Sequence, residues 1–517
     1  MNLATALELA ALRYPETEAI ITDAECFSYY GWNRRVNSVS WGLIKAGIRP
    51  GDRVAICTTN GEAPATMYFA VQRAGAAAVL LNARWKHQEM AYAINEAAVK
   101  AILFDATTKS EVMLAVHQYG QDLVCIEASR SPFDAGGTGT IYFEELAGKP
   151  ADEVPEIPLQ DLATGTILYT SGTTGRPKGV CRSPRSDYFA ALGMILEHRW
   201  ERFERTLAVM PLYHTMGLHT LISMVLLNGT SVMLPRVDPA ECIKYMESER
   251  ITALYLVPTI YHDLVEVVAG FRHRDLGVSK LAYAGAPMSA SLVRKCRTIF
   301  DPRVFVNQYG CTEMHAITIN HDPERNPLSV GRPSLHSRIR IVTADRNRRV
   351  PPTEALPQGM TGELIVHAAS PQAFTGYLNQ PEVTEQVLRD GWYFTGDLAF
   401  MDHEGNLYLV GRVDDMIISG GENIYPAEVE QILLGHSQVK EAAVVGMADK
   451  RWGESVTAFI VPAAAELDHR TMERFCLEHP GLARYKRPRQ FVFVKEIPKS
   501  PTGKILRSLL KQGRYTP

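Results

Sequence analysis

The sequence has few cysteines, and they are not arranged in any recognisable pattern. Its 517 residues include 8 cysteines, which are scattered along the chain without a C-x-x-C pair. Disulfide frameworks and structural zinc sites usually require several cysteines at regular spacings. Neither is therefore expected to organise this fold, and the scattered thiols indicate a reducing compartment, the cytoplasm.

A large excess of charge and a long apolar run are also missing. The chain has 54 Lys and Arg against 57 Asp and Glu, a formal net charge of -3, so no global field draws it onto nucleic acid. The apolar tract at 67–81 is interrupted by Gln72 and Arg73, and the tract at 218–227 is too short to span a bilayer. The beginning of the chain carries Glu8 within its apolar run, which predicts an amphipathic helix rather than a signal peptide. We expect no nucleic-acid partner and no membrane span. The oligomeric state stays open, with a homodimer as one option.

The sequence does have the composition and length of a globular protein with two or three domains: 46% of its residues are hydrophobic and 21% are charged. β-rich runs alternate with helical patterns, which predicts an α/β fold with parallel sheets covered by helices. The predicted strands of this part lie at 53–57, 75–81, 100–104, 206–210, 230–234, 254–257, 281–284 and 304–306. Later runs predict a smaller β-rich unit at 338–342, 362–366 and 407–410, and a compact α+β domain from residue 415 onward with strands near 442–446, 456–461 and 491–494.

The most informative motif is TSGTTGRPKG at 170–179, which directly follows the apolar run TILY. This order predicts a buried strand that leads into a phosphate-binding loop, because glycines permit close backbone approach while free N–H groups, hydroxyls and Lys178 bind anions. A Walker A loop requires Ser or Thr directly after the lysine, where this sequence has Gly179. Taken alone, the segment could also be a surface turn rich in Gly and Thr.

Four further segments follow in the order that a nucleotide site would use. QYGCTE at 308–313 offers an aromatic face for a purine, a hydroxyl for phosphate and a carboxylate for magnesium. Asp397 follows an aromatic run, and an acid there can bind ribose hydroxyls. GRVDD at 411–415 joins the large part to the C-terminal region, and PKSPTGKI occupies 498–505. Each segment has a plain structural explanation by itself, such as a core aromatic, a turn aspartate or a surface ion pair. Their joint presence favours a nucleotide site.

Together the five segments resemble the adenylate-forming superfamily, which includes acyl-CoA synthetases, adenylation domains of peptide synthetases and beetle luciferases. The resemblance covers essentially the whole chain, and 374–426 and 449–462 are most similar to bacterial benzoate-type ligases such as 4-chlorobenzoate–CoA ligase. It implies a large N-terminal domain (1–411) of two flavodoxin-like parallel-sheet subdomains plus a distorted β-barrel, a hinge (412–414) and a small mobile α+β lid (415–517). The implied reaction joins a carboxylic acid to CoA through an acyl-adenylate, with ATP and Mg²⁺.

The resemblance also assigns roles to individual residues. The β- and γ-phosphates would be held by Thr170, Ser171, Gly172, Thr173, Thr174, Gly175 and Lys178. Adenine would be held by Gly285, Ala286, Pro287 and Tyr309, and ribose by Asp397 and Arg412. The implied catalytic residues are Thr312 on the α-phosphate, Glu313 on Mg²⁺, Lys504 between the α-phosphate and the carboxylate, and His214 beside the acid. Asp414 would be the hinge residue, and Ile418 stands where many relatives have lysine.

Two further sets would hold the thiol and the acid. The implied CoA contacts are Arg84, Gly421, Trp452, Lys486 and Arg487, whereas a solvated basic face explains Lys86 and Arg489 equally well. The implied acyl pocket is lined by His214, Thr215, Met216, Ala284, Gln308, Gly310 and His315. For His214 a core histidine bonded to the backbone is nearly as good an explanation. This compact lining, with Gln308 and His315 as its polar groups, favours an aromatic or cyclic acid with a polar substituent over a long alkyl chain.

Four alternatives remain open at this point. One is a luciferase-like oxygenation of the same adenylate, which the motifs do not exclude although nothing in the sequence supports it. The adenylate could be loaded onto a carrier protein, although the basic cluster at 485–489 favours free CoA. The acid could be a fatty or short-chain acid. A non-catalytic adenylate-binding sensor is the fourth alternative, and the joint presence of Lys504, Glu313 and Asp397 argues against it, because a sensor has no need of a lysine that acts on the reacting groups.

Overall fold

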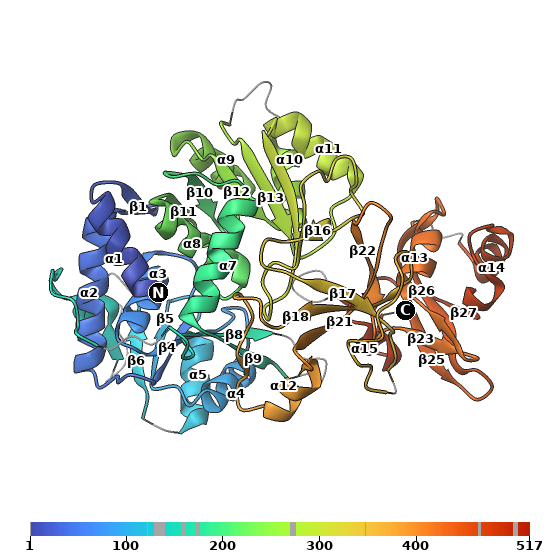
Figure 1. Ribbon diagram of the computed structural model, residues 1–517, viewed down its shortest axis with the longest axis horizontal. Coiled ribbons are helices and arrows are strands. Elements are labelled where there is room, and N and C mark those ends of the chain that lie inside the picture. The colour runs from blue at the N-terminus through green and yellow to red at the C-terminus, as the bar shows by residue number, and fades with distance from the viewer. Residues whose placement is uncertain are drawn as a thin grey trace. The chain divides into compact units, whose positions relative to one another are not determined.

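The chain folds into two compact units. The computed structural model describes residues 2–120, 122–128, 140–157, 161–170, 176–268, 276–346, 348–463, 467–499 and 505–516. Unit 1 comprises residues 1–338 and 367–391, and unit 2 comprises residues 339–366 and 392–517. Figure 1 shows the elements of both units, coloured along the chain. The predicted division into an N-terminal domain (1–411), a hinge (412–414) and a C-terminal lid (415–517) stays a prediction.

The first sheet of unit 1 is mainly parallel. Its strands are, in spatial order, β19 (Gly376–Tyr377), β9 (Lys178–Arg182), β8 (Thr166–Thr170), β4 (Ala77–Leu80), β3 (Arg53–Cys57), β5 (Ala101–Phe104), β6 (Val124–Glu127) and β7 (Thr140–Tyr142). The strands from β8 to β7 in this order are parallel, and β9 and β19 are added antiparallel at one edge.

Helices bury both faces of this sheet. In β3, Val54 and Ile56 pack in a cluster with α1 (Leu3–Arg13), α2 (Tyr29–Lys45) and α3 (Glu62–Arg73). The alternate residues Ala55 and Cys57 pack with α4 (His87–Glu96) and α5 (Lys109–Tyr119), as the two-residue period of a strand requires. The short α6 (Phe143–Ala147) follows β7. Both faces are apolar because both are covered, which explains the continuous apolar runs in the sequence.

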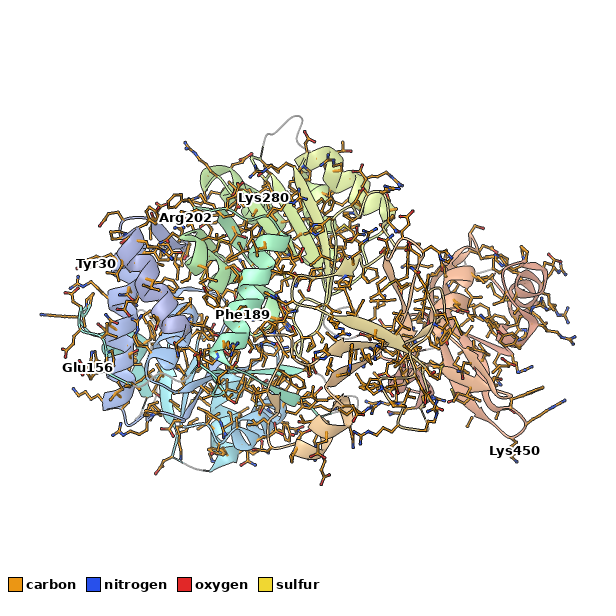
Figure 2. All side chains as sticks on the ribbon, in the orientation of Figure 1. Tyr30, Glu156, Phe189, Arg202, Lys280 and Lys450 are labelled. Carbon is orange, nitrogen blue, oxygen red and sulfur yellow. The ribbon has the colours of Figure 1, made fainter. Side chains whose placement is uncertain are left out.

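The second sheet of unit 1 is built in the same way. Its strands are, in spatial order, β16 (Arg332–Pro333), β15 (Thr318–Asn320), β14 (Val304–Tyr309), β13 (Lys280–Ala284), β12 (Ala253–Leu256), β10 (Arg205–Ala208), β11 (Thr230–Met233), β1 (Glu18–Ile21) and β2 (Cys26–Ser28). Strands β14, β13, β12, β10, β11 and β1 are parallel. The buried Lys280 at the start of β13 (Figure 2) makes ion pairs with Glu204 and Glu201.

Helices cover both faces of this second sheet. Leu254 and Leu256 of β12 pack with α9 (Pro239–Ser248), α10 (Pro258–Val268) and α11 (Ala290–Phe300), which lie together in Figure 1. Ala253 and Tyr255 pack on the opposite face with α7 (Pro184–Glu197) and α8 (Thr215–Leu227). Unit 1 also contains α12 (Pro381–Val387) and β20 (Leu388–Arg389). The predicted α/β class with parallel sheets is therefore confirmed, as is the predicted helix at the beginning of the chain.

Unit 2 contains two antiparallel arrangements of strands. The first comprises β17 (Ile339–Val342), β18 (Gly362–His367), β21 (Trp392–Met401) and β22 (Leu407–Arg412), around a small core that includes Trp392 and Phe394. The second comprises, in order, β24 (Glu422–Ile424), β23 (Ile417–Ser419), β26 (Gly453–Pro462) and β25 (Val439–Asp449), with β27 (Gln490–Phe493) paired parallel to β26. The strands predicted near 338–342, 362–366, 407–410, 442–446, 456–461 and 491–494 are all present.

Helices cover the last sheet on both sides. Val429 of α13 (Pro426–Leu434) and Met472 of α14 (His469–Glu478) pack with Val444 and Ile460. Leu510 of α15 (Arg507–Lys511) packs on the other face with Val445, and the 3₁₀ helix η2 (Arg484–Lys486) precedes β27. Across the described part of the chain, none of the helices is both long enough and apolar enough to cross a bilayer.

Candidate active site

The predicted phosphate loop connects the two strands of a hairpin in unit 1. Thr170, the last residue of β8, pairs with Lys178, the first residue of β9. The loop residues Ser171, Gly172, Thr173, Thr174 and Gly175 lie outside the described part of the chain. A Walker A loop leads from a strand into a helix. Because this loop leads into a strand, the topology excludes that alternative.

A tyrosine connects the hairpin to the predicted magnesium ligand. Tyr377 lies in β19, which pairs with β9, and Lys178 Nζ is 5.4 Å from the centre of the Tyr377 ring. Tyr377 Oη donates a hydrogen bond of 2.7 Å to Glu313 Oε1. Glu313 and Tyr377 are only 8% and 9% exposed, so water competes little for this bond. The tyrosine therefore fixes the orientation of the Glu313 carboxylate. Tyr377 is not predictable from the sequence as a partner of Glu313, because no short motif contains both residues.

The predicted adenine and phosphate residues follow two neighbouring parallel strands. β13 ends at Ala284, which pairs with Gln308 of β14. The exposed segment Gly285, Ala286 and Pro287 comes next, and Tyr309, Thr312 and Glu313 come at and after the end of β14. Ligands of open α/β sheets bind beyond the carboxyl ends of the strands. The structure therefore places these residues at one such edge, as the motifs implied.

The predicted acyl-pocket residues come from two places in unit 1. His214 occupies the N-cap position of α8 without a capping hydrogen bond from its side chain, Thr215 is the first residue of that helix, and Met216 is buried. His214 is half-buried, and its ring centre is 4.7 Å from that of Tyr213. The other residues, Ala284, Gln308, Gly310 and His315, belong to β13, β14 and the turn after β14.

The turn after β14 is tightly packed against itself. A Cβ atom on Gly310 would lie 1.4 Å from the carbonyl oxygen of His315, so only glycine fits there. His315 has a φ of +52°, a left-handed conformation that is unusual for a residue with a side chain. Its N–H donates to Cys311 O at 2.7 Å. These constraints hold His315 in one position, two residues after Glu313.

A buried polar network, which the sequence analysis also missed, extends from β9 to this turn. Asp187 Oδ1 accepts from Arg182 Nε at 2.5 Å and lies 3.0 Å from His219 Nε2. His219 Nδ1 lies 3.0 Å from His315 Nδ1. Arg182 Nη1 also donates to the carbonyl of Thr312 at 2.8 Å. The network therefore connects the turn that carries Thr312, Glu313 and His315 to the start of α7 and to α8.

Burial and charge set the protonation of this network. Burial alone would raise the pKa of Asp187, but Arg182 and His219 outweigh it and lower that pKa to about 2. Burial lowers the pKa of His219, and burial together with His219 and Arg182 lowers that of His315 far more. At neutral pH the carboxylate is therefore charged and both imidazoles are neutral.

A second buried histidine orients Gln308. His198 Nε2 lies 3.0 Å from Gln308 Oε1, and the His198 ring packs edge-on against Trp200 and Tyr255. Burial lowers the pKa of His198 to about 3, so this ring is also neutral. Because an amide oxygen only accepts hydrogen bonds, the proton of His198 is on Nε2.

The predicted ribose-binding pair lies in unit 2. Asp397 of β21 and Arg412 of β22 are cross-strand neighbours, and Arg412 Nη1 donates to Asp397 Oδ1 at 2.6 Å. Arg412 also donates to the carbonyl of Thr395 at 3.1 Å. The guanidinium is half-exposed and well anchored. The structure thus brings the two residues together, and their contact with ribose stays a prediction.

The predicted hinge residue Asp414 is exposed just after β22, and the residues around it are tied together within unit 2. Arg346 Nη2 is 3.0 Å from Glu454 Oε2, and Arg346 Nη1 donates to the carbonyl of Asp414 at 3.4 Å. The same Glu454 oxygen accepts from the backbone N–H of Ile418 at 2.7 Å. The predicted catalytic Lys504 lies outside the described residues.

The predicted CoA residues are divided between the units. Arg84 is exposed in unit 1, and the other four belong to unit 2. In unit 2 the Trp452 ring has the guanidinium groups of Arg451 and Arg489 at 4.6 and 4.4 Å from its centre. Gly421 has a φ of +86°, Lys486 makes an ion pair with Glu428, and Arg487 is half-buried. Arg489, which the sequence alone left ambiguous, thus contacts the aromatic ring.

The donor set around Glu313 fits magnesium better than a metal held by protein ligands alone. Within the described ranges, no three His, Cys, Asp or Glu side chains are grouped so as to hold a metal ion. Mg²⁺ is commonly bound by one or two carboxylates together with substrate phosphates. A single oriented carboxylate, connected through Tyr377 to the phosphate-binding hairpin, matches that mode.

The chain is similar to known proteins over nearly its whole length. Residues 7–378 match the family described as AMP-binding enzyme, and residues 428–504 match the AMP-binding enzyme C-terminal domain. The chain is 32% identical to 4-chlorobenzoate–CoA ligase of Arthrobacter sp, over 98% of this chain and 95% of the relative. It is 33% identical to feruloyl-CoA synthase of Amycolatopsis sp, over 96% of each. Its structure is similar to that of o-succinylbenzoate CoA synthetase from Bacillus subtilis in complex with the acyl-adenylate intermediate OSB-AMP, with a TM-score of 0.82, 29% identity and 99% of each chain covered.

Proposed function

The chain belongs to the family of AMP-binding enzymes, and we propose that it joins an aromatic or cyclic carboxylic acid to coenzyme A at the expense of ATP. In the first step a carboxylate oxygen attacks the α-phosphorus of ATP, the bond to the β-phosphate breaks, and pyrophosphate leaves. In the second step the CoA sulfur attacks the carbonyl carbon of the acyl-adenylate, the bond to AMP breaks, and the thiol proton is released. The products are an acyl-CoA thioester, AMP and pyrophosphate.

The observation that carries this proposal is the connection from Lys178 through Tyr377 to Glu313. Two anions approach one another in the first step, and at ~4 Å their repulsion is about 4 kcal/mol at an effective dielectric constant of ~20. Fixed positive groups must offset this repulsion. Lys178 stands at the base of the loop assigned to the phosphates, and Glu313 is oriented to hold Mg²⁺, which would neutralise phosphate charge when bound. We assign the remaining positive group to Lys504.

The other site residues keep the roles that their motifs imply. We assign the adenine to Gly285, Ala286, Pro287 and Tyr309, the α-phosphate to Thr312, and the ribose to the Asp397–Arg412 pair. The network around Arg182 supports the assignment of Thr312, because it holds the backbone at that residue. We further propose that the segment after Asp414 rotates between the two steps.

Coenzyme A is favoured over a carrier protein by the surroundings of Trp452. The guanidinium groups of Arg451 and Arg489 lie over the Trp452 ring, and these planar cations offer a stacking surface and positive charge to the ADP portion of CoA. Arg84, Gly421, Lys486 and Arg487 complete the proposed CoA site. A cytoplasmic location agrees with this substrate and with eight cysteines that are all free thiols.

A ring-containing acid is favoured by the relatives and by the pocket. The names of the relatives specify 4-chlorobenzoate and the feruloyl group, both of which contain an aromatic ring. The proposed lining comprises His214, Thr215, Met216, Ala284, Gln308, Gly310 and His315, and the turn that carries Gly310 has no space for a further side-chain atom.

The test is pyrophosphate release with a panel of acids, assayed with and without CoA. The panel includes benzoate, substituted benzoates, ferulate, cyclohexanecarboxylate, butyrate and palmitate, and mass spectrometry identifies the thioester. We expect the enzyme to turn over ring acids, and we expect this turnover to continue only when CoA is present. Faster turnover of palmitate or butyrate than of every ring acid would refute the choice of substrate. Pyrophosphate release without any acyl-CoA product would refute the choice of acceptor.

A further inference from the structure

The loop that connects β10 to α8, residues 209–214, is bound by an asparagine from the other sheet of unit 1. Asn60 lies between β3 and α3 of the first sheet, whereas β10 belongs to the second. Its Nδ2 donates to the carbonyls of Ala208 at 3.1 Å and Met210 at 2.9 Å, and its Oδ1 accepts from the backbone N–H of Leu212 at 3.2 Å. One side-chain amide thus uses both of its donor hydrogens and its acceptor on the backbone at the start of this loop.

The loop also packs closely against the helix that follows it. A Cβ atom on Gly217 of α8 would lie 2.3 Å from the carbonyl oxygens of Met210 and Pro211, so only glycine fits there. At the end of the loop, the N–H of His214 donates to the carbonyl of Pro211 at 3.0 Å. The backbone is therefore held by Asn60 and by contact with α8 directly before it reaches His214.

Asn60 itself stands on a well-supported part of the first sheet. The chain leaves β3 towards β4 but leaves β5 towards β6, so the loops after β3 and β5 diverge at this point. Asp105, directly after β5, joins the two loops: its Oδ2 accepts from the N–H and from Oγ1 of Thr59, both at 2.7 Å. Asp105 Oδ1 also accepts from the N–H of Thr108 at 3.0 Å. The residue that precedes Asn60 is therefore anchored to the neighbouring strand, which gives the asparagine a fixed base.

We propose that Asn60 is a positioning residue for the acid: it holds the loop 209–214 so that His214 lies beside the carboxylate during adenylation. The inference rests on the proposed function, in which His214 contacts the acid. The last of the three hydrogen bonds is made by Leu212, a buried residue only two positions before the imidazole. A displacement of about 1 Å at a reacting group can lower the rate by about 100-fold. Loss of the contacts made by Asn60 therefore acts on the acid through His214.

The test is a double-mutant cycle between Asn60 and His214, with the acid of the panel that the wild-type enzyme turns over fastest. Asn60→Ala removes all three hydrogen bonds, and Asn60→Asp keeps the acceptor for Leu212 but cannot donate to Ala208 and Met210. We expect each to lower kcat/KM for the acid in adenylation by about 10- to 100-fold and to leave KM for ATP within about twofold. In a His214→Ala background the same substitutions should cost less than about threefold, because residues that act through one another are not additive.

Asn320 offers a matched control in unit 1. Its Nδ2 donates to the carbonyls of Asn326 at 2.8 Å and Ser329 at 3.0 Å, and its Oδ1 accepts from the N–H of Asp322 at 2.9 Å. Asn320→Ala thus removes the same three kinds of hydrogen bond from a different loop. Its effect on kcat/KM should be the same in the wild-type and His214→Ala backgrounds, as a merely structural role requires.

The outcomes separate this inference from the proposed function. If the effects of Asn60→Ala and His214→Ala were additive, or if His214→Ala left kcat/KM for the acid unchanged, the inference would be overturned and the proposed function would stand. If no acid of the panel released pyrophosphate, both would fall.

A milder variant serves if the Asn60 variants fail to fold, as judged by their thermal transitions. Thr59→Val keeps the shape of the side chain and the N–H bond to Asp105 and removes only the hydroxyl bond. The base of Asn60 is then loosened, and kcat/KM for the acid should fall by about two- to fivefold. This loss should disappear in the His214→Ala background, and a loss that persists there would overturn the inference.

Discussion

Removing the hydroxyl of Tyr377 should weaken magnesium binding and the adenylation step together. Tyr377→Phe keeps the ring whose centre lies 5.4 Å from Lys178 Nζ and deletes the hydroxyl that donates the 2.7 Å hydrogen bond to Glu313. The carboxylate then loses the group that holds it in one rotamer. Residues that orient metal ligands in this way typically change metal affinity or activity by about 10- to 100-fold.

The strength of the hydrogen bond between Tyr377 and Glu313 predicts the same range of about 10- to 100-fold. A hydrogen bond to a charged group contributes about 1.5–3 kcal/mol, and each 1.36 kcal/mol is about a tenfold change. Because both residues are less than a tenth exposed, water replaces the lost donor poorly. We therefore expect kcat/KM for adenylation to fall by about 10- to 100-fold, and the Mg²⁺ concentration for half-saturation to rise by a similar factor.

The assay is single-turnover formation of acyl-adenylate across a magnesium titration, followed by thioester formation from preformed adenylate. The second half-reaction should be nearly unaffected, because it breaks no bond to pyrophosphate. Tyr30→Phe is the control: it removes a tyrosine–aspartate hydrogen bond at an exposed position of the same unit (Figure 2). A Tyr377→Phe enzyme with the wild-type magnesium dependence would refute the reasoning.

Three further changes test other parts of the molecule. Lys504→Ala should slow adenylation by about 100- to 1000-fold and spare thioester formation from preformed adenylate; normal adenylation would remove that lysine from the proposed role. Arg346→Ala breaks the ion pair with Glu454, which is partly exposed and therefore worth about 0.5–1 kcal/mol. The ratio of the adenylation rate to the thioester-forming rate should change by about two- to fivefold. Equal losses in both rates would contradict a role of this ion pair in the orientation of the lid. Burial lowers the pKa of His198 from 6.5 to about 3. Below pH 6.5 the unfolded chain therefore binds a proton that the folded protein excludes. As the pH falls from 6.5 towards 3, the free energy of unfolding decreases by about 1.4 kcal/mol per pH unit. His198→Gln should flatten the decline of the urea midpoint between pH 6 and 4.5, and an unchanged slope would show that the histidine is not buried as a neutral group.

The fold class was predictable because its signals are local. In β3 and β12 every residue is buried or nearly so, and such continuous apolar runs separated by helical patterns indicate parallel strands. Short polar motifs after strands, such as 308–313, were equally readable. The pairing of Asp397 with Arg412 places the two motifs on adjacent strands, as their shared assignment to ribose implied.

The missed residues depend on long-range contacts. Tyr377 reaches Glu313 across 64 residues, and His219 reaches His315 across 96. Asp187 and His219 are ordinary polar residues within helical patterns, and nothing in their own segments shows that both point into one buried network. Sequence patterns report periodicity, whereas these contacts depend on how separate elements are packed.

The close packing of Gly310 against the carbonyl of His315 restricts how the enzyme can be re-engineered. A designer who wished to reshape the acid pocket would normally begin by varying the small residues that line it. Here even a methyl group at position 310 would displace the backbone that carries His315 and the proposed magnesium ligand Glu313. New substrate range would therefore come from positions outside the turn, such as Thr215 and Met216 of α8, which also belong to the proposed acyl pocket.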